Sequence, residues 1–278
     1  MVAEKVVGRE RPRSVEEWIA QIELAWQKIP EVKVDPEKLK HLVIICDGNR
    51  RAAKEERGFH PWDGHRAGVE TIKGISRAAR EWGIHTLTFW TWSTENWGRE
   101  AKQVELIMKL AAQGLNDKRI IEELINNQVR FTHIGRKDRL QAGFPSVAKA
   151  LKNLEARTAE FTRYQLNLVM DYGGLDETTR AIGKMFESFQ EGKFEPRILQ
   201  ENPKVILEFL DTAGQSLPDL VIRTGVTQEE IPHTSGFMPL QTAYACWEFV
   251  PDLFPDLTPQ RLLDSISEFI VYKRRLGK

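Results

Sequence analysis

Short apolar runs alternate with longer helical stretches along most of the chain, from about residue 41 onward. The apolar runs are typical of buried strands. They occupy residues 42–46, 85–90, 129–134, 165–170 and 220–222. Helical patterns cover residues 64–82, 102–124, 178–189 and 203–210, and one more begins at Pro145. Strand followed by helix, repeated, predicts an α/β fold with a central parallel sheet flanked by helices and covered on both faces.

The segment before residue 41 has a different pattern. Ser14 and Glu17 have the spacing of a capping box, and apolar positions beginning with Trp18 follow at helical intervals before Pro30. This pattern predicts an N-terminal amphipathic helix. We therefore expect a helical extension over residues 1–40 and one α/β domain over residues 41–278.

Composition and charge exclude several classes of protein. Forty Lys and Arg balance forty Asp and Glu in the 278 residues, so no overall charge favours nucleic-acid binding. The apolar runs are too short to cross a bilayer and the first residues lack a signal-type apolar stretch, so we expect a cytoplasmic protein. Cys46 and Cys246 provide neither a disulfide framework nor zinc-site spacing.

Polar residues follow the first apolar run directly, in the segment DGNRR. Ligands collect at the carboxyl ends of parallel strands, so this position favours binding. Gly48 allows a tight turn, while Asn49, Arg50 and Arg51 bring donors to a helix start and Asp47 is suited to hold magnesium. The segment predicts a diphosphate cradle, with a solvated loop and a surface arginine pair as the alternative.

Two further segments carry polar groups. His65 and Arg66 open the next predicted helix and either face the same anion or form a capping turn at the surface. Residues 91–99 combine hydroxyls, an amide, a carboxylate and an arginine with tryptophans, among them Trp92, next to Trp90. That mixture suits an amphiphile with a charged head and an apolar tail. The alternative is that the tryptophans are core and the polar residues cap a helix.

Taken in order, six motifs resemble those of the cis-prenyltransferases, the undecaprenyl diphosphate synthase-like isoprenyl transferases, over roughly residues 41–278. The motifs are HLVIICDGNRR, GHRAGVE, LTFWTWSTENWGR, DLVIRTG, SGFMPLQTAYA and the terminal RRLG. The resemblance implies a parallel sheet surrounded by helices, a hydrophobic tunnel and usually a dimer. It also implies Mg²⁺-dependent condensation of isopentenyl diphosphate with an allylic prenyl diphosphate to give a cis-prenyl diphosphate.

The resemblance also assigns roles to residues around the first diphosphate. Asp47 matches the family's essential aspartate, which positions magnesium and the diphosphates. Asn49 and Arg51 match residues near the allylic diphosphate, and His65 matches a histidine that handles the diphosphate. With Asn96, Asp47 is a candidate catalytic residue.

Other matches surround the reacting carbons and the second substrate. The family's polar cluster beside the reacting carbons is matched by Ser93, Asn96 and Arg99, and its neighbouring aromatic residue by Trp97. Two groups that bind isopentenyl diphosphate are matched by Arg223 and Ser235. A phosphate contact across the dimer interface is matched by Arg275 with Gly277.

Several positions depart from the family pattern. Pro61 and Ala52 replace an arginine and a tryptophan near the diphosphate site, and His233 stands where a second isopentenyl-binding arginine is usual. Cys246 replaces the metal-binding glutamate. A thiol is a poor partner for magnesium, but Glu248 faces the same way if this segment is extended, and is then a candidate metal ligand.

Condensation of the two diphosphates is the leading interpretation, and two alternatives stay open. A weakened second site would leave an enzyme that acts on the allylic diphosphate alone, terpene-synthase-like or cyclising. A non-catalytic subunit would instead stabilise a catalytic homologue. We expect a homodimer or a heteromer with a homologue, no nucleic-acid partner, and peripheral membrane association if the product is long.

Overall fold

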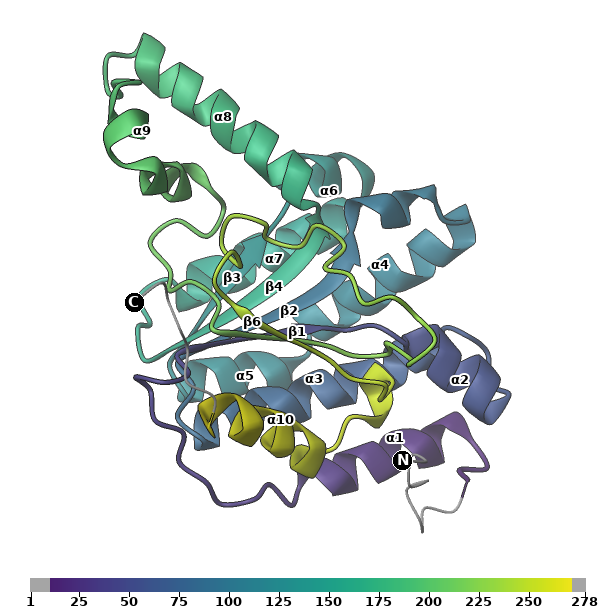
Figure 1. Ribbon diagram of the computed structural model, residues 1–278. Helices are drawn as coiled ribbons and strands as arrows, with labels where there is room; N and C mark the ends of the chain where they lie inside the picture. Colours follow the sequence, from purple (N-terminus) through teal and green to yellow (C-terminus); the bar gives the residue numbers. More distant parts are fainter. Residues whose placement is uncertain (1–10, 272–278) are drawn as a thin grey trace.

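Six parallel strands form the centre of the protein, which the computed structural model describes over residues 11–271 (Figure 1). Their order across the sheet is β3-β4-β2-β1-β5-β6, and every neighbouring pair is parallel. The strands are β1 (His41–Ile45), β2 (Thr86–Ser93), β3 (Val129–Ile134), β4 (Tyr164–Tyr172), β5 (Leu220–Arg223) and β6 (Cys246–Phe249). The α/β prediction is confirmed, and β6 is a strand that the apolar pattern did not predict.

Helices connect and cover the strands. The α-helices are α1 (Val15–Trp26), α2 (Asn49–Arg57), α3 (Asp63–Glu81), α4 (Ala101–Leu115), α5 (Lys118–Asn126), α6 (Lys137–Gly143), α7 (Pro145–Thr158), α8 (Gly174–Gln190), α9 (Ile198–Glu201) and α10 (Pro259–Val271). Short 3₁₀ helices are η1 (Thr94–Gly98), η2 (Pro203–Phe209) and η3 (Phe254–Asp256). The helix predicted over 102–124 is two helices, because the Asp117 side chain caps a new N-terminus by accepting from the Arg119 backbone.

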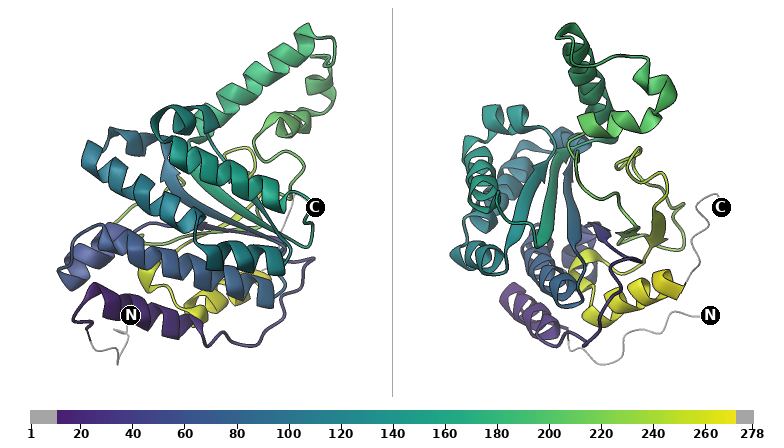
Figure 2. Two further views of the ribbon diagram at one scale, coloured as in Figure 1. Left: turned by 180° about the vertical axis from the view of Figure 1, so that it is seen from behind. Right: turned by 90° about the vertical axis from the view of Figure 1, so that its left-hand side faces the viewer.

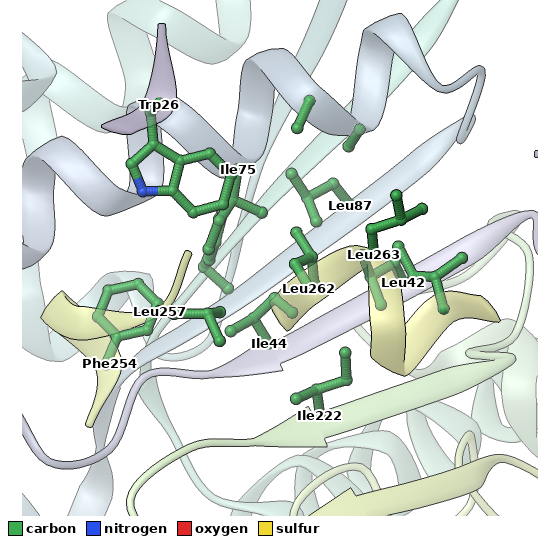
Figure 3. Close-up of a cluster of buried hydrophobic side chains, with 14 of the residues drawn as sticks. Trp26, Leu42, Ile44, Ile75, Leu87, Ile222, Phe254, Leu257, Leu262 and Leu263 are labelled. Carbon is green, nitrogen blue, oxygen red and sulfur yellow. The ribbon is translucent and has the colours of Figure 1, made fainter. Parts of the chain in front are cut away.

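The two faces of the sheet are covered differently. One face packs against α3 and α10, with α1 packed on the outside of α3, in a large apolar cluster that Figure 3 draws in part. The same face packs against α4, α5 and α7 in a second cluster. The other face is covered mainly by the irregular segment 224–245, whose Phe237 and Met238 are buried against Val43 and Val221. In the right-hand view of Figure 2 the teal helices and this green-yellow segment lie on opposite sides of the sheet.

The N-terminal helix predicted from the capping box is α1, and the Ser14 side chain accepts from the backbone N–H of Glu17 as expected. Trp18 and Trp26 belong to the large cluster with α3. A Cβ on Gly74 of α3 would lie 2.2 Å from the Trp26 ring, so the two helices approach closely. The domain boundary at residue 40 stays a prediction.

A bulge in β2 separates the directions of two tryptophans. Trp90 pairs with Val169 and Trp92 with Met170, so Thr91 is an extra residue in the register. Trp90 therefore lies in the cluster on the loop-covered face, whereas Trp92 lies in the cluster with α4 and α7. The bulge places Trp92 beside the apolar helices rather than beside Trp90.

Candidate active site

A polar cavity of about 510 Å³ lies at the carboxyl ends of β1, β2 and β5. The predicted site residues that line it are Asp47, Gly48, Asn49, Arg50, Arg51, His65, Ser93, Asn96, Arg99, Arg223 and Ser235. Residues from motifs nearly 190 positions apart in the chain thus meet at one edge of the sheet, as expected for an α/β fold.

Asp47 is held between two arginines and the start of α2. Its Oδ1 accepts from the Gly48 backbone N–H at 2.7 Å and lies 3.7 Å from Arg51 Nη2. Its Oδ2 accepts from Arg223 Nη2 at 2.9 Å. Thr224, which the sequence interpretation missed, accepts from the Asp47 backbone N–H at 3.0 Å through Oγ1. The carboxylate is therefore fixed in orientation although its side chain is 40% exposed.

Gly48 gives the backbone the turn from β1 into α2. Its φ is 94°, in the left-handed region, and a Cβ there would lie 2.7 Å from the Leu253 side chain. The turn places Asn49, Arg50 and Arg51 in the first turn of α2. Asn49 is buried and donates through Nδ2 to the Cys46 carbonyl at 2.8 Å, so it fastens the helix to β1.

The GHRAG motif positions α3 against α2. A Cβ on Gly64 would lie 1.8 Å from the Asn49 carbonyl oxygen, and one on Gly68 would lie 2.5 Å from Asn49 Oδ1. Arg66 pairs with Asp63 at 3.2 Å and Glu16 at 3.4 Å, outside the cavity. The two glycines thus hold Asn49 in place, while Arg66 lies at the surface.

His65 faces the cavity as an uncharged imidazole at neutral pH. Burial, together with the nearby cations Arg99 and Arg50, lowers the pKa of His65 to about 4. Its ring stacks on Trp62 with centroids 6.0 Å apart, and its buried Nε2 has no hydrogen-bond partner among the described residues. An uncharged ring with an unsatisfied nitrogen is suited to one hydrogen bond with a ligand.

Ser93 and Asn96 cap the short helix η1 reciprocally. The Ser93 backbone N–H donates to Asn96 Oδ1 at 3.1 Å, and the Ser93 side chain accepts from the Asn96 backbone. Both residues line the cavity as well, so capping and ligand contact are compatible here. The capping contact directs Asn96 Oδ1 to Ser93 and leaves the Nδ2 group as the side chain's donor.

Trp97 lies outside the residues that line the polar cavity. Its Nε1 donates to the buried Asp171 carboxylate at 2.7 Å, and its ring stacks on Phe144 with centroids 5.7 Å apart. The indole is anchored in the α7 side of the core. Arg99, in contrast, faces the cavity and lies over the Trp92 ring, 5.4 Å from its centroid.

Arg223 joins β5 to the loop that carries Ser235. Its Nη1 donates to Ser235 Oγ and to the His233 carbonyl, both at 2.7 Å. The His233 imidazole lies beside them, with Nδ1 3.0 Å from Ser235 Oγ, but it is exposed and does not line the cavity. The buried Nε of Arg223 has no partner among the described residues.

Glu248 lies in an extended segment, β6, as its candidate role as a metal ligand requires. Its Oε1, however, accepts from Arg261 Nη2 and Ser265 Oγ of α10, both at 2.9 Å. Glu248 is not among the residues that line the cavity. Residues 11–271 contain no group of three or more His, Cys, Asp or Glu side chains placed to hold a metal. Arg275 and Gly277 lie outside the described residues.

An apolar cavity of about 180 Å³ adjoins the polar one. Both cavities are lined by the same five residues at their junction, Cys46, Asn49, His65, Thr91 and Trp92. Beyond the junction the walls are side chains such as Ile107, Leu110 and Leu154 from the helices covering the sheet. Polar and apolar chambers thus meet at the bulge of β2.

Acid is expected to destabilise the protein through His41, which lies at the opposite end of β1. Burial lowers the pKa of His41 to about 4 from 6.5, and it outweighs the hydrogen bond between Nδ1 and the Ser216 carbonyl at 2.7 Å, which acts in the opposite direction. The unfolded chain therefore binds a proton that the folded chain does not bind in this pH range. The free energy of unfolding falls as the pH drops from 6.5 towards 4, by about 3 kcal/mol at most.

Urea unfolding at several pH values between 7 and 4.5 measures this effect. The His41→Gln variant is expected to be less stable at pH 7, but to lose less stability towards pH 4.5 than the parent protein. Equal pH dependence in both proteins would contradict the assignment to His41.

Known proteins resemble the chain over most of its length. A family model described as putative undecaprenyl diphosphate synthase matches residues 45–277. An isoprenyl transferase from Agrobacterium fabrum is 35% identical over 238 residues, 86% of this chain and 92% of the relative. The tritrans,polycis-undecaprenyl-diphosphate synthase (geranylgeranyl-diphosphate specific) of Thermococcus kodakarensis is 35% identical over 240 residues, 86% of this chain and 87% of the relative.

A solved structure agrees with these relatives. Lavandulyl diphosphate synthase from Lavandula x intermedia, in complex with dimethylallyl diphosphate, has a TM-score of 0.78 at 28% identity and covers 88% of this chain and 100% of its own. The parallel sheet and the paired chambers therefore define an enzyme that transfers prenyl groups. The chain belongs to the undecaprenyl diphosphate synthase family, as the sequence motifs indicated.

Proposed function

We propose that this protein condenses isopentenyl diphosphate with an allylic prenyl diphosphate to give a cis-prenyl diphosphate. The observation that carries the proposal is the direct junction between a cavity lined by four arginines and a second, apolar cavity. The polar cavity is lined by only two carboxylates, Asp47 and Glu95, so it retains a surplus of positive charge. That surplus suits diphosphate groups, and the apolar cavity suits a prenyl chain.

The two diphosphates have separate binding groups in this proposal. The first turn of α2 presents backbone N–H groups with Arg50 and Arg51, which suit the allylic diphosphate at a helix N-terminus. Arg223 and Ser235, on the other side of Asp47, suit isopentenyl diphosphate. Trp92 lines both cavities and has Arg99 over its ring, so we place the reacting carbons beside Trp92, between the arginine-lined cavity and the apolar one.

Magnesium fits Asp47 as one protein ligand beside the diphosphate oxygens. Mg²⁺ is commonly bound by one or two carboxylates plus substrate phosphates, and Asp47 is a fixed, half-exposed carboxylate in the cavity. Glu248 would have to leave Arg261 to join it. When bound, the ion would supply positive charge that stabilises the negative charge on the leaving diphosphate.

The condensation needs charge stabilisation and one proton transfer. The allylic C–O bond breaks as C1 of the allylic chain bonds to C4 of the isopentenyl unit, whose C2 then loses a proton as inorganic diphosphate leaves. Arg50, Arg51 and Arg99 stabilise the charge of the leaving group. Asn96 and Ser93 orient the second substrate through their side-chain donors, and a diphosphate oxygen accepts the proton.

The test is product analysis with and without the second substrate. Purified protein, magnesium and farnesyl or geranyl diphosphate are incubated with or without labelled isopentenyl diphosphate, and the products are identified by mass spectrometry. Chains that grow by five carbons only when isopentenyl diphosphate is present support the proposal. The absence of product in both reactions contradicts it. Activity that appears only on mixing with a catalytic homologue would favour the partner-subunit alternative.

Action on an allylic diphosphate alone is the second candidate. Lavandulyl diphosphate synthase, to which this chain is structurally similar, was solved with dimethylallyl diphosphate. In this chain the second-substrate side also carries His233 in place of the usual arginine. Diphosphate release with a hydrocarbon or alcohol product from the allylic substrate alone would favour this candidate.

We further propose a homodimer that forms through α8, which projects away from the sheet (Figure 1). Four of its apolar side chains are exposed at spacings of seven, four and three residues, as in a helix–helix interface. They are Leu175, Ile182, Phe186 and Phe189, with exposed fractions from 45% to 83%. A second copy of α8 is apolar along the same line, so the surface complements itself.

Phe186→Glu is expected to shift a dimer to a monomer in light scattering during gel filtration, because it buries a charge at the centre of the interface. Leu24→Glu is the matched control, since Leu24 is 60% exposed on α1. A Phe186→Glu protein with the parent's mass in solution would contradict this interface.

The cytoplasmic location and the membrane association of a long product stay predictions. None of the described helices is long and apolar enough to span a bilayer.

A further inference from the structure

We propose that Glu177 is a positioning residue that holds the Ser235 loop, residues 233–242, in its binding conformation from the first turn of α8. The idea rests on the proposed function, because the loop's ligand is taken to be isopentenyl diphosphate. The acidic side chain has no part in the chemistry described above, yet it is almost completely buried, with 1% of its surface exposed.

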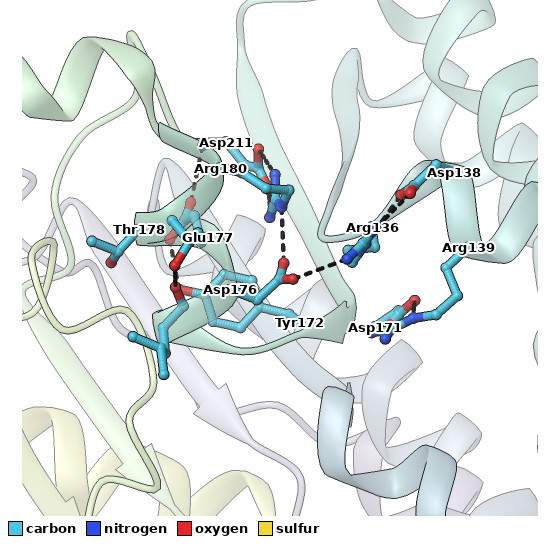
Figure 4. A network of polar contacts seen from close by, with 12 residues as sticks. Arg136, Asp138, Arg139, Asp171, Tyr172, Asp176, Glu177, Thr178, Arg180 and Asp211 are labelled. Carbon is cyan, nitrogen blue, oxygen red and sulfur yellow. Dashed lines mark hydrogen bonds and ion pairs between the residues drawn. The ribbon is translucent and has the colours of Figure 1, made fainter. Parts of the chain in front are cut away.

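The Glu177 carboxylate receives donors from three separate segments. Its Oε2 accepts from Tyr172 Oη at 2.6 Å and from Gln241 Nε2 at 2.8 Å, and its Oε1 accepts from the Asp211 backbone N–H at 2.9 Å. Figure 4 shows Glu177 and Tyr172 facing each other beside the ion pairs of Arg180. Burying a carboxylate costs free energy unless the carboxylate is hydrogen-bonded. The Glu177 carboxylate is hydrogen-bonded to three segments, and it thereby joins the end of β4, the segment at Asp211 and the Ser235 loop.

The same turn of α8 supports the loop by close contact. A Cβ on Gly174 would lie 2.1 Å from the Gly236 carbonyl oxygen and 2.5 Å from Pro239 Cδ. The loop backbone thus rests directly on the helix start, one residue after Ser235. Glu177 then fixes the other end of the loop through Gln241.

The loop adopts a conformation that needs such support. Ser235 and Met238 have φ values of 51° and 43°, in the left-handed region that non-glycine residues rarely adopt. Between them, Phe237 packs on Trp90 and Tyr172, with ring centroids 4.8 and 5.8 Å apart. Strained residues persist only where surrounding contacts determine them. The Glu177 network supplies two such contacts to this loop, through Gln241 and through Tyr172, whose ring packs on Phe237.

The expected consequence is selective for one substrate. Ser235 and Arg223 belong to the loop side of the cavity, whereas Arg50 and Arg51 are held by α2. A looser Ser235 loop should therefore weaken binding of isopentenyl diphosphate and leave binding of the allylic diphosphate nearly unchanged. A general loss of structure would affect both.

The experiment compares Glu177→Gln and Gln241→Met with the parent protein. Each is expected to raise KM for isopentenyl diphosphate about tenfold while KM for the allylic diphosphate stays within about twofold. The double variant is expected to show little more than the larger single effect on KM for isopentenyl diphosphate, because both residues act on the loop through the hydrogen bond that they share. Glu187→Gln, an exposed position on the same helix, is the matched control.

Hydrogen exchange of residues 233–242 in the free protein is measured alongside the kinetics. Faster exchange there in both variants, with the strands of the sheet unchanged, supports the inference whatever the protein's reaction. If Glu177→Gln fails to fold, Gln241→Met alone carries both measurements. Unchanged loop exchange, or equal changes in both KM values, overturns the inference. An inactive parent protein with a loosened loop in the variants would instead overturn the proposed function.

Discussion

Replacement of Asp47 by alanine is expected to lower the rate of condensation about a thousandfold or more. The change removes the carboxylate proposed to hold magnesium and leaves Arg223 Nη2 without its 2.9 Å partner. It also removes the oxygen that accepts from the Gly48 N–H at the turn into α2. Both proposed diphosphate positions are thus disturbed by one substitution, because Asp47 lies between Arg51 and Arg223.

Single-turnover measurements with labelled isopentenyl diphosphate test this expectation. Asp47→Asn separates charge from shape, since an amide oxygen still accepts from Gly48 but binds magnesium weakly; it is expected to lose most of the activity as well. Glu55→Ala, an exposed position on α2, is the control and should behave as the parent does. Turnover by Asp47→Ala equal to that of the control would contradict the proposed role.

Gly64→Ala is expected to destabilise the fold by about 3 kcal/mol. Helix propensity alone predicts the opposite sign, because alanine is favoured over glycine inside a helix by about 1 kcal/mol. Here the added Cβ would lie 1.8 Å from the Asn49 carbonyl oxygen, which is backbone and has no rotamer by which to move away. Either α3 shifts away from α2 or the first turn of α2 is displaced, so activity should fall as well.

Urea denaturation and the condensation assay measure the two effects of Gly64→Ala. Gly183→Ala is the matched control, because Gly183 is also inside a helix but nothing lies within 4 Å of a Cβ there. That control should be stabilised by about 0.5–1 kcal/mol. Equal stabilisation of both variants would show that α2 and α3 are not as closely packed as described.

The sequence was sufficient for the features that depend on local pattern. Five of the six strands follow from apolar runs, since continuous apolar runs suit strands buried on both faces. The placement of DGNRR directly after β1 predicted its position at the ligand-binding edge. β6 was missed because its four residues include a charged side chain, Glu248, whose partner Arg261 lies thirteen positions away.

Other features depended on contacts between distant segments. The sequence left two interpretations of the GHRAG motif open, an anion contact and a capping turn at the surface. Only the packing of α3 on α2 decided that His65 lines the cavity, that Arg66 lies outside it and that the two glycines lie against Asn49. Likewise, no local signal marks Thr224 as the residue that fixes the Asp47 backbone, because the two are 177 positions apart.

The sequence by itself determined the parallel sheet, the family and most of the residues that meet at the sheet edge. Only the tertiary structure decided how those residues are oriented and charged. A one-residue bulge at Thr91 sends Trp90 and Trp92 to opposite faces, and burial beside cations leaves His65 uncharged. The reason is physical: residue pattern sets local conformation, whereas register, burial and electrostatic environment arise only once distant segments have packed together.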